Sequence, residues 1–219
     1  MASPPPPRHF ALLAAVFEGG LAIVAVAAGW LMGTDPLASL RWDAIGAAWG
    51  LAATLPMLGA VWLSLKSRFG PLRHLLRVVD DLLVPMFRGL PLIELAGISL
   101  LAGLGEEMLF RGLIQQAVAD GFDTPQGAWV ALVAASVLFG LAHRVTNTYA
   151  VLAGLIGFYL GGLWMLTDNL LVPIVAHAMY DFVVLVYLVH IRKPPESSAQ
   201  QADHPNHGQD AQGPPDHPL

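Results

Sequence analysis

Residues 105–112 place three ionisable side chains, Glu106, Glu107 and Arg111, inside an otherwise apolar run. The flanking residues 90–104 and 113–119 contain one charged side chain, Glu94. Each ionised group at membrane depth costs about 2.5–3.5 kcal/mol on insertion scales. Anchoring in a bilayer does not require three charges within six positions. We therefore interpret this stretch as part of a buried reactive site.

The composition indicates an integral membrane protein. The 219 residues are 55% hydrophobic and 12% charged, and the mean hydropathy is +0.59. Soluble domains have about 25% charged residues. The absence of cysteine excludes disulfides and thiolate metal sites. No basic segment interleaved with aromatic residues is present, so nucleic acid is not an expected partner.

Six apolar segments approach or exceed the roughly 20 helical residues that cross a bilayer. They are residues 10–32, 45–65, 91–118, 127–143, 148–166 and 170–190. These segments predict an all-α polytopic membrane protein with about six transmembrane helices, the last four forming a catalytic core. A cleaved signal peptide is the alternative for the first segment, but its length and the interruption by Glu18 favour a retained helix. Glu18 is expected to face another helix.

The chain is predicted to have five parts. They are a flexible N-terminal lead (1–9), two transmembrane helices (10–65), a basic amphipathic membrane-surface segment (66–90), an intramembrane core (91–191) and a disordered C-terminal tail (192–219). If the N-terminus is cytoplasmic, nine of the 11 Lys and Arg residues lie on the cytoplasmic side of the membrane. Arg41 lies on the outer side, and Arg111 lies within the membrane. The positive-inside rule then predicts that both termini are cytoplasmic. The composition suggests a bacterial inner membrane.

The later segments add three ionisable residues at a similar depth. His143 ends the fourth segment, and His177 and Asp181 lie in the sixth. Counting from the outer turns at 1.5 Å per residue places Glu106 about 18 Å deep and Asp181 about 17 Å deep. Three helices are thus expected to bring polar side chains to one layer of the membrane.

Helical spacing suggests how these side chains pair. Glu107 and Arg111 are four residues apart and can form an ion pair, whereas Glu106 points about 100° away from Glu107. His177 and Asp181 also share a helix face, so the carboxylate can orient the imidazole.

The set of groups suits activation of water, because it has a potential general base and two imidazoles but no serine or cysteine nucleophile. A structural polar network that ties helices together is an equally open alternative. Intramembrane Glu and His also mark proton relays, so a proton-coupled transporter is a third alternative, although the chain has no internal repeat.

Three motifs resemble those of the CPBP intramembrane proteases, also called the Abi family. They are Glu106-Glu107-x-x-x-Arg111, Phe139-x-x-x-His143 and His177-x-x-x-Asp181. This family includes the CAAX prenyl endopeptidase type 2 and bacterial bacteriocin-processing and self-immunity proteins. The resemblance covers about residues 91–190, and the three motifs together are more specific than any one of them.

The resemblance implies an intramembrane endopeptidase. It implies that Glu106 is the general base on the attacking water, that His143 positions this water, and that His177 and residue 181 stabilise the oxyanion. Glu107 and Arg111 would support the site and hold the substrate. The eukaryotic-type enzymes usually have asparagine at the position of Asp181, and an ionised aspartate cannot donate a hydrogen bond.

The resemblance also suggests partners. The expected substrate is a membrane-anchored or lipidated peptide or protein in the lipid bilayer, but bacteria generally lack prenylated CAAX proteins. A non-catalytic scaffold or a self-immunity protein that uses the same cluster for binding is the alternative function. The family is often labelled metalloprotease, and Zn²⁺ or another divalent metal would use Glu106, His143 and His177. The missing His-Glu-x-x-His and the nearby Arg111 favour metal-independent chemistry.

Overall fold

The computed structural model describes residues 7–122 and 124–192, and every regular element within these ranges is a helix. The all-α fold class is therefore confirmed. Most of the predicted flexible lead and nearly all of the predicted disordered tail lie outside the described residues.

The helices follow one another in the expected order. Their bounds are α1 (Pro7–Met32), α2 (Ala44–Lys66), α3 (Gly70–Val78), the π-helical η1 (Val79–Leu83), α4 (Val84–Phe87), α5 (Leu92–Glu107), the π-helical η2 (Met108–Gln115), α6 (Gln116–Asp120), α7 (Pro125–Ala142), α8 (Asn147–Thr167), α9 (Leu171–Val186) and the π-helical η3 (Tyr187–Ile191). Elements α5, η2 and α6 form one continuous helical segment that carries the first motif.

Four helical segments are long and apolar enough to cross a membrane. They are His9–Met32, Ala44–Lys66, Asn147–Thr167 and Leu171–Ile191. The segment Leu92–Asp120 contains Glu106, Glu107 and Arg111 and qualifies only together with Gly70–Phe87. These two helices meet at 114°. The fourth predicted span forms an apolar helix, Gln126–Ala142, that is shorter than a full span. Length and apolar composition therefore support four or five spans rather than all six.

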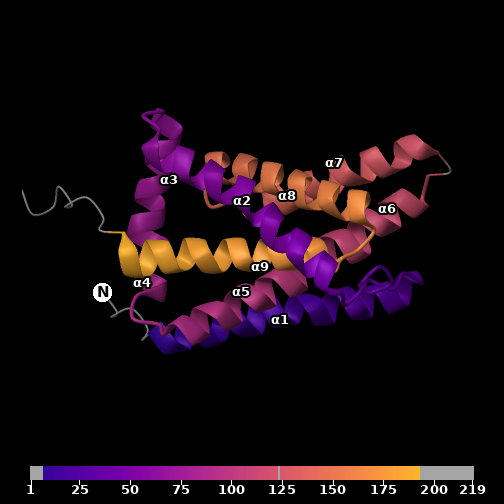
Figure 1. The fold of residues 1–219 in the computed structure, drawn as a ribbon, viewed down its shortest axis with the longest axis horizontal. Helices are drawn as coiled ribbons and strands as arrows, with labels where there is room; N and C mark the ends of the chain where they lie inside the picture. The colour runs from indigo at the N-terminus through magenta and orange to yellow at the C-terminus, as the bar shows by residue number, and fades with distance from the viewer. Residues whose placement is uncertain (1–6, 123, 193–219) are drawn as a thin grey trace, which may run out of the picture.

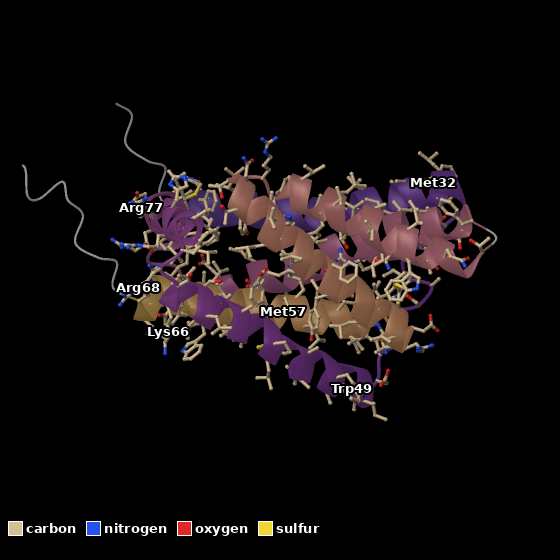
Figure 2. All side chains as sticks on the ribbon, turned by 90° about the horizontal axis from the view of Figure 1, so that it is seen from above. Met32, Trp49, Met57, Lys66, Arg68 and Arg77 are labelled. Carbon is tan, nitrogen blue, oxygen red and sulfur yellow. The ribbon has the colours of Figure 1, made fainter. Side chains whose placement is uncertain are left out.

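The long helices run side by side, and α3 lies across one end of them (Figure 1). Helix α5 packs between α1 and α9, α2 packs on α9, and α7 packs on α8. Figure 2 shows Lys66, Arg68 and Arg77 at one end of the molecule and Met32 and Trp49 at the other. The basic segment thus lies at one end of the bundle, across the direction of the long helices.

Glycines permit close contact between the helices that carry the motifs. A Cβ atom on Gly103 would lie 2.9 Å from the carbonyl oxygen of Ile174, so α5 and α9 touch through their backbones. A Cβ atom on Gly140 would lie 2.5 Å from the carbonyl oxygen of Ala150, so α7 and α8 do the same. Such contacts are typical of helix packing in bilayers, where small residues let backbones approach.

Candidate active site

Glu107 connects three helical segments inside the bundle. Its Oε1 lies 2.8 Å from Nδ1 of His177 on α9, and its Oε2 lies 3.2 Å from Nε of Arg111 on η2. Both Glu107 and Arg111 are completely buried. Arg111 also donates a 2.8 Å hydrogen bond from Nη2 to the carbonyl oxygen of Gly157 on α8. The predicted pair of Glu107 and Arg111 is present, and the contact with His177 extends it into a network.

Glu106 points in another direction, toward α7. Its Oε2 lies 3.5 Å from Nε2 of His143. The Nδ1 atom of His143 donates a 2.8 Å hydrogen bond to the carbonyl oxygen of Phe139, because a carbonyl oxygen only accepts. The Phe139 and His143 rings are stacked with centroids 4.4 Å apart. These two contacts hold the imidazole with Nε2 toward the glutamate.

Asp181 completes the set on α9. Its Oδ2 lies 3.5 Å from Nε2 of His177, one helical turn earlier. Because an ionised carboxylate only accepts, Nδ1 of His177 carries a proton toward Glu107, and Nε2 faces Asp181. His177 therefore lies between two carboxylates from different helices.

A large, mostly apolar cavity of about 1070 Å³ opens beside these residues. Glu106, His143 and Asp181 line it, together with Tyr149 and Tyr180. The cavity extends along apolar side chains of α1, α2, α3 and η1. Glu107, Arg111 and His177 are not among its lining residues and lie behind this wall. The six predicted site residues thus form a cavity-facing group and a supporting buried group.

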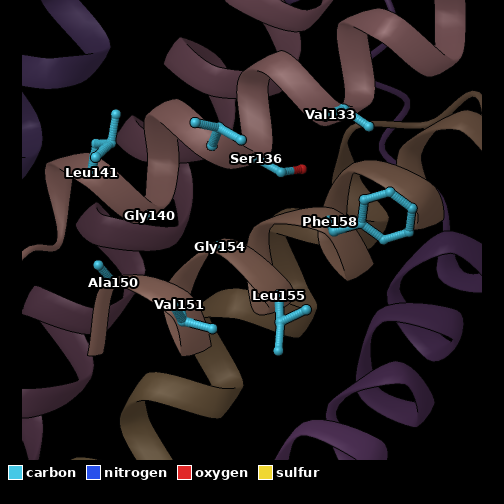
Figure 3. A pocket seen from close by; sticks show the side chains of 10 residues that line it. Val133, Ser136, Gly140, Leu141, Ala150, Val151, Gly154, Leu155 and Phe158 are labelled. Atoms are coloured by element: carbon cyan, nitrogen blue, oxygen red, sulfur yellow. The ribbon is translucent and has the colours of Figure 1, made fainter. Parts of the chain in front are cut away.

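A smaller groove of about 370 Å³ lies between α7 and α8 and belongs to a different surface (Figure 3). None of the ten residues that line it is charged; they include Val133, Gly140, Gly154 and Phe158. The hydroxyl of Ser136 in this groove donates a hydrogen bond to the carbonyl oxygen of Leu132, and no imidazole or carboxylate is among the lining residues.

The proposed metal ligands come from three helices and do not converge. Glu106 and His143 face each other, but Nδ1 of His177 contacts Glu107 and its Nε2 faces Asp181. In the described part of the chain, no group of three or more His, Asp or Glu side chains is arranged to hold a metal ion. As arranged, Glu106, His143 and His177 do not fit a bound metal.

Residues 88–183 match the family model described as type II CAAX prenyl endopeptidase Rce1-like. This part of the chain is similar to that family and is here called the Rce1-like domain. The resemblance expected from the three motifs is confirmed at this level. The Rce1-like domain contains all six predicted site residues, while α1, α2 and α3 lie outside it.

A curated relative also resembles this chain. The uncharacterized protein YpbD of Bacillus subtilis (strain 168) is 32% identical over 101 residues, which cover 44% of this chain and 47% of YpbD. The match thus spans about half the length of this relative. No solved structure matches the chain.

Two features of the site are absent from the sequence-based prediction. Spacing predicts the partner of Glu107 on its own helix, Arg111, but not His177, which is 70 residues away. The π-helical η2 begins directly after Glu107, and π-helical turns often occur at functional sites. The contact with His177 has no signal in the sequence pattern, because it depends on how α5 packs against α9.

Proposed function

We propose that this protein is an intramembrane endopeptidase that hydrolyses a peptide bond of a membrane-anchored substrate with water activated by Glu106. The observation that carries this proposal is the Glu106–His143 pair on the wall of a large apolar cavity. The oxygen Oε2 of Glu106 is buried and accepts no hydrogen bond from any described residue. Glu106 and His143 both line the cavity, so the carboxylate can accept a hydrogen bond from water that lies there beside Nε2 of His143.

The reaction follows from these positions. Glu106 removes a proton from water, and the water oxygen attacks the carbonyl carbon of the scissile bond. The C–N bond then breaks, and the leaving nitrogen takes the proton from Glu106. Charge that develops on the carbonyl oxygen is stabilised by a hydrogen-bond donor, which we assign to the proton shared by Nε2 of His177 and Asp181.

The buried group supports this chemistry from behind. Glu107 orients His177 by accepting the Nδ1 proton, and Arg111 balances the charge of Glu107 and binds α8 through the carbonyl of Gly157. This arrangement fixes the direction in which His177 presents Nε2.

The membrane context suggests how substrate enters. The apolar side chains of α3 and η1 line the cavity, and basic side chains such as Arg73 and Arg77 are exposed on the same segment. We infer that this segment lies on the cytoplasmic surface of a bacterial inner membrane and borders the entrance for lipidated or amphipathic substrates.

The deciding experiment compares purified wild type, Glu106→Gln and Glu94→Gln in nanodiscs with a library of membrane-tethered peptides, with and without chelator. Glu94→Gln makes the same chemical change on α5 away from the cavity lining. We expect cleavage by the wild type and by Glu94→Gln, and none by Glu106→Gln. Equal cleavage by all three variants, or binding without any cleavage, would contradict the proposal. Loss of cleavage with chelator that Zn²⁺ restores would show that a metal takes part.

A further inference from the structure

Glu18 on α1 lines the same cavity as Glu106 and Asp181. His143 lines this cavity too, so Glu18 shares it with three ionisable side chains of the proposed site. Helix α1 is not part of the Rce1-like domain, and the mechanism above does not use Glu18. An ionisable residue within a membrane helix generally marks a functional position.

The packing of α1 on α5 holds Glu18 in this place. A side chain on Gly105 would collide with the backbone carbonyl of Glu18 and would approach Cβ of Leu21 to 3.3 Å. The backbone of α1 therefore contacts α5 one residue before Glu106. This contact fixes the height of Glu18 relative to the proposed general base.

Glu18 has no counter-charge among the described residues. Its Oε2 is buried without a hydrogen-bond donor, and no cation of residues 7–122 or 124–192 lies within ion-pair distance. Glu106, which is 6% exposed, also has an oxygen without a donor. The cation on the cavity wall, Arg144, is exposed and donates to Asn147. The described lining near Glu106 is therefore acidic, and the hydroxyls of Tyr149 and Tyr180 are among its neutral donors.

Burying a carboxylate without a hydrogen-bond donor costs free energy. A positively charged donor offsets this cost most effectively, because hydrogen bonds between charged groups are the strongest. We propose that Glu18 is a specificity-determining residue that binds a Lys or Arg side chain of the peptide substrate next to the scissile bond. This inference rests on the proposed function, because it takes the cavity as the place where peptides bind. It assigns to α1 a role in choosing the substrate.

The test measures binding without cleavage, in the Glu106→Gln variant in nanodiscs. The probes are pairs of fluorescent myristoylated peptides. The two members of a pair differ at one position, which is Lys in one and norleucine in the other, and this position differs from pair to pair. At one position we expect the Lys peptide to bind at least about tenfold more tightly, as a charge-assisted hydrogen bond predicts. Adding Glu18→Gln should remove this preference, Glu18→Asp should keep part of it, and Glu94→Gln should leave it unchanged.

Several results would overturn the inference. One is that no peptide binds, or that Lys is preferred at no position. Another is that the preference for Lys survives Glu18→Gln, or that Glu18→Gln weakens the binding of the Lys and norleucine peptides equally. Elution of each variant as a single species in size-exclusion chromatography checks that it is folded. Because the assay requires no cleavage, a failure of the proteolysis experiment alone would contradict the enzyme activity and leave the binding preference measurable.

Discussion

The Nδ1 atom of His177 lies 2.8 Å from Oε1 of Glu107, and this contact joins α9 to the helix that carries the first motif. Glu107 also contacts Arg111, so one buried carboxylate faces both an imidazole and a guanidinium. The adjacent Glu106 faces the cavity and has His143 as its partner. Two neighbouring glutamates thus have different surroundings and different proposed roles.

Glu107→Gln should lower the free energy of unfolding far more than Glu106→Gln. The substitution leaves the guanidinium of Arg111, which is completely buried, without its counter-charge, at a cost of about 3–5 kcal/mol. Thermal unfolding in one detergent, followed by circular dichroism, measures the difference. The double variant Glu107→Gln/Arg111→Met should be more stable than Glu107→Gln alone, since no unpaired buried charge remains. Additive losses in the double variant would show that the ion pair does not matter for stability.

Asp181→Asn should retain cleavage within about tenfold, whereas Asp181→Ala should lower kcat by about 10²–10³, as loss of an oxyanion donor does. An asparagine side chain has the same shape and supplies an amide donor at the same place. Steady-state kinetics with a peptide cleaved by the wild type measures both variants. Equal inactivation by the two substitutions would instead indicate that the carboxylate itself is required.

Gly140→Ala should destabilise the protein by about 1–3 kcal/mol, because the new Cβ would lie 2.5 Å from the carbonyl oxygen of Ala150. The displacement of α7 from α8 should also shift His143, three residues later, and reduce activity. Gly162→Ala on α8 is the matched control, since a Cβ there meets nothing within 4 Å. The control should be neutral or stabilising by up to about 1 kcal/mol. Similar unfolding temperatures for the two variants would refute the close-contact explanation.

The orientation in the membrane can be tested by cysteine labelling, because the chain contains no cysteine. Asp120→Cys, at the end of α6, should react with a membrane-impermeant maleimide in intact spheroplasts. Arg68→Cys, between α2 and α3, should react only after the membrane is permeabilised. Both native side chains are exposed, so accessibility in the fold does not limit the reaction. The reverse pattern would invert the proposed topology.

The sequence predicted much of the fold and part of the site. Apolar runs located the helices, and four-residue spacing correctly predicted the contacts of Glu107 with Arg111 and of His177 with Asp181. The depth estimate predicted a common layer of polar side chains, and the family resemblance implied that Glu106 and His143 act together; they lie 3.5 Å apart. The span count was less well predicted, since the charges of Leu92–Asp120 and the short Gln126–Ala142 depart from a simple membrane helix.

What the sequence by itself determined is local: which segments are helical and apolar, and which polar side chains share a helix face. These properties depend on residue type and on the geometry of one helix. Only the tertiary structure decided that Glu107 contacts His177, that Arg111 binds the carbonyl of Gly157, and that Glu18 joins the cavity wall. Those relationships depend on the rotation and height of one helix against another, which backbone contacts at small residues such as Gly105 set.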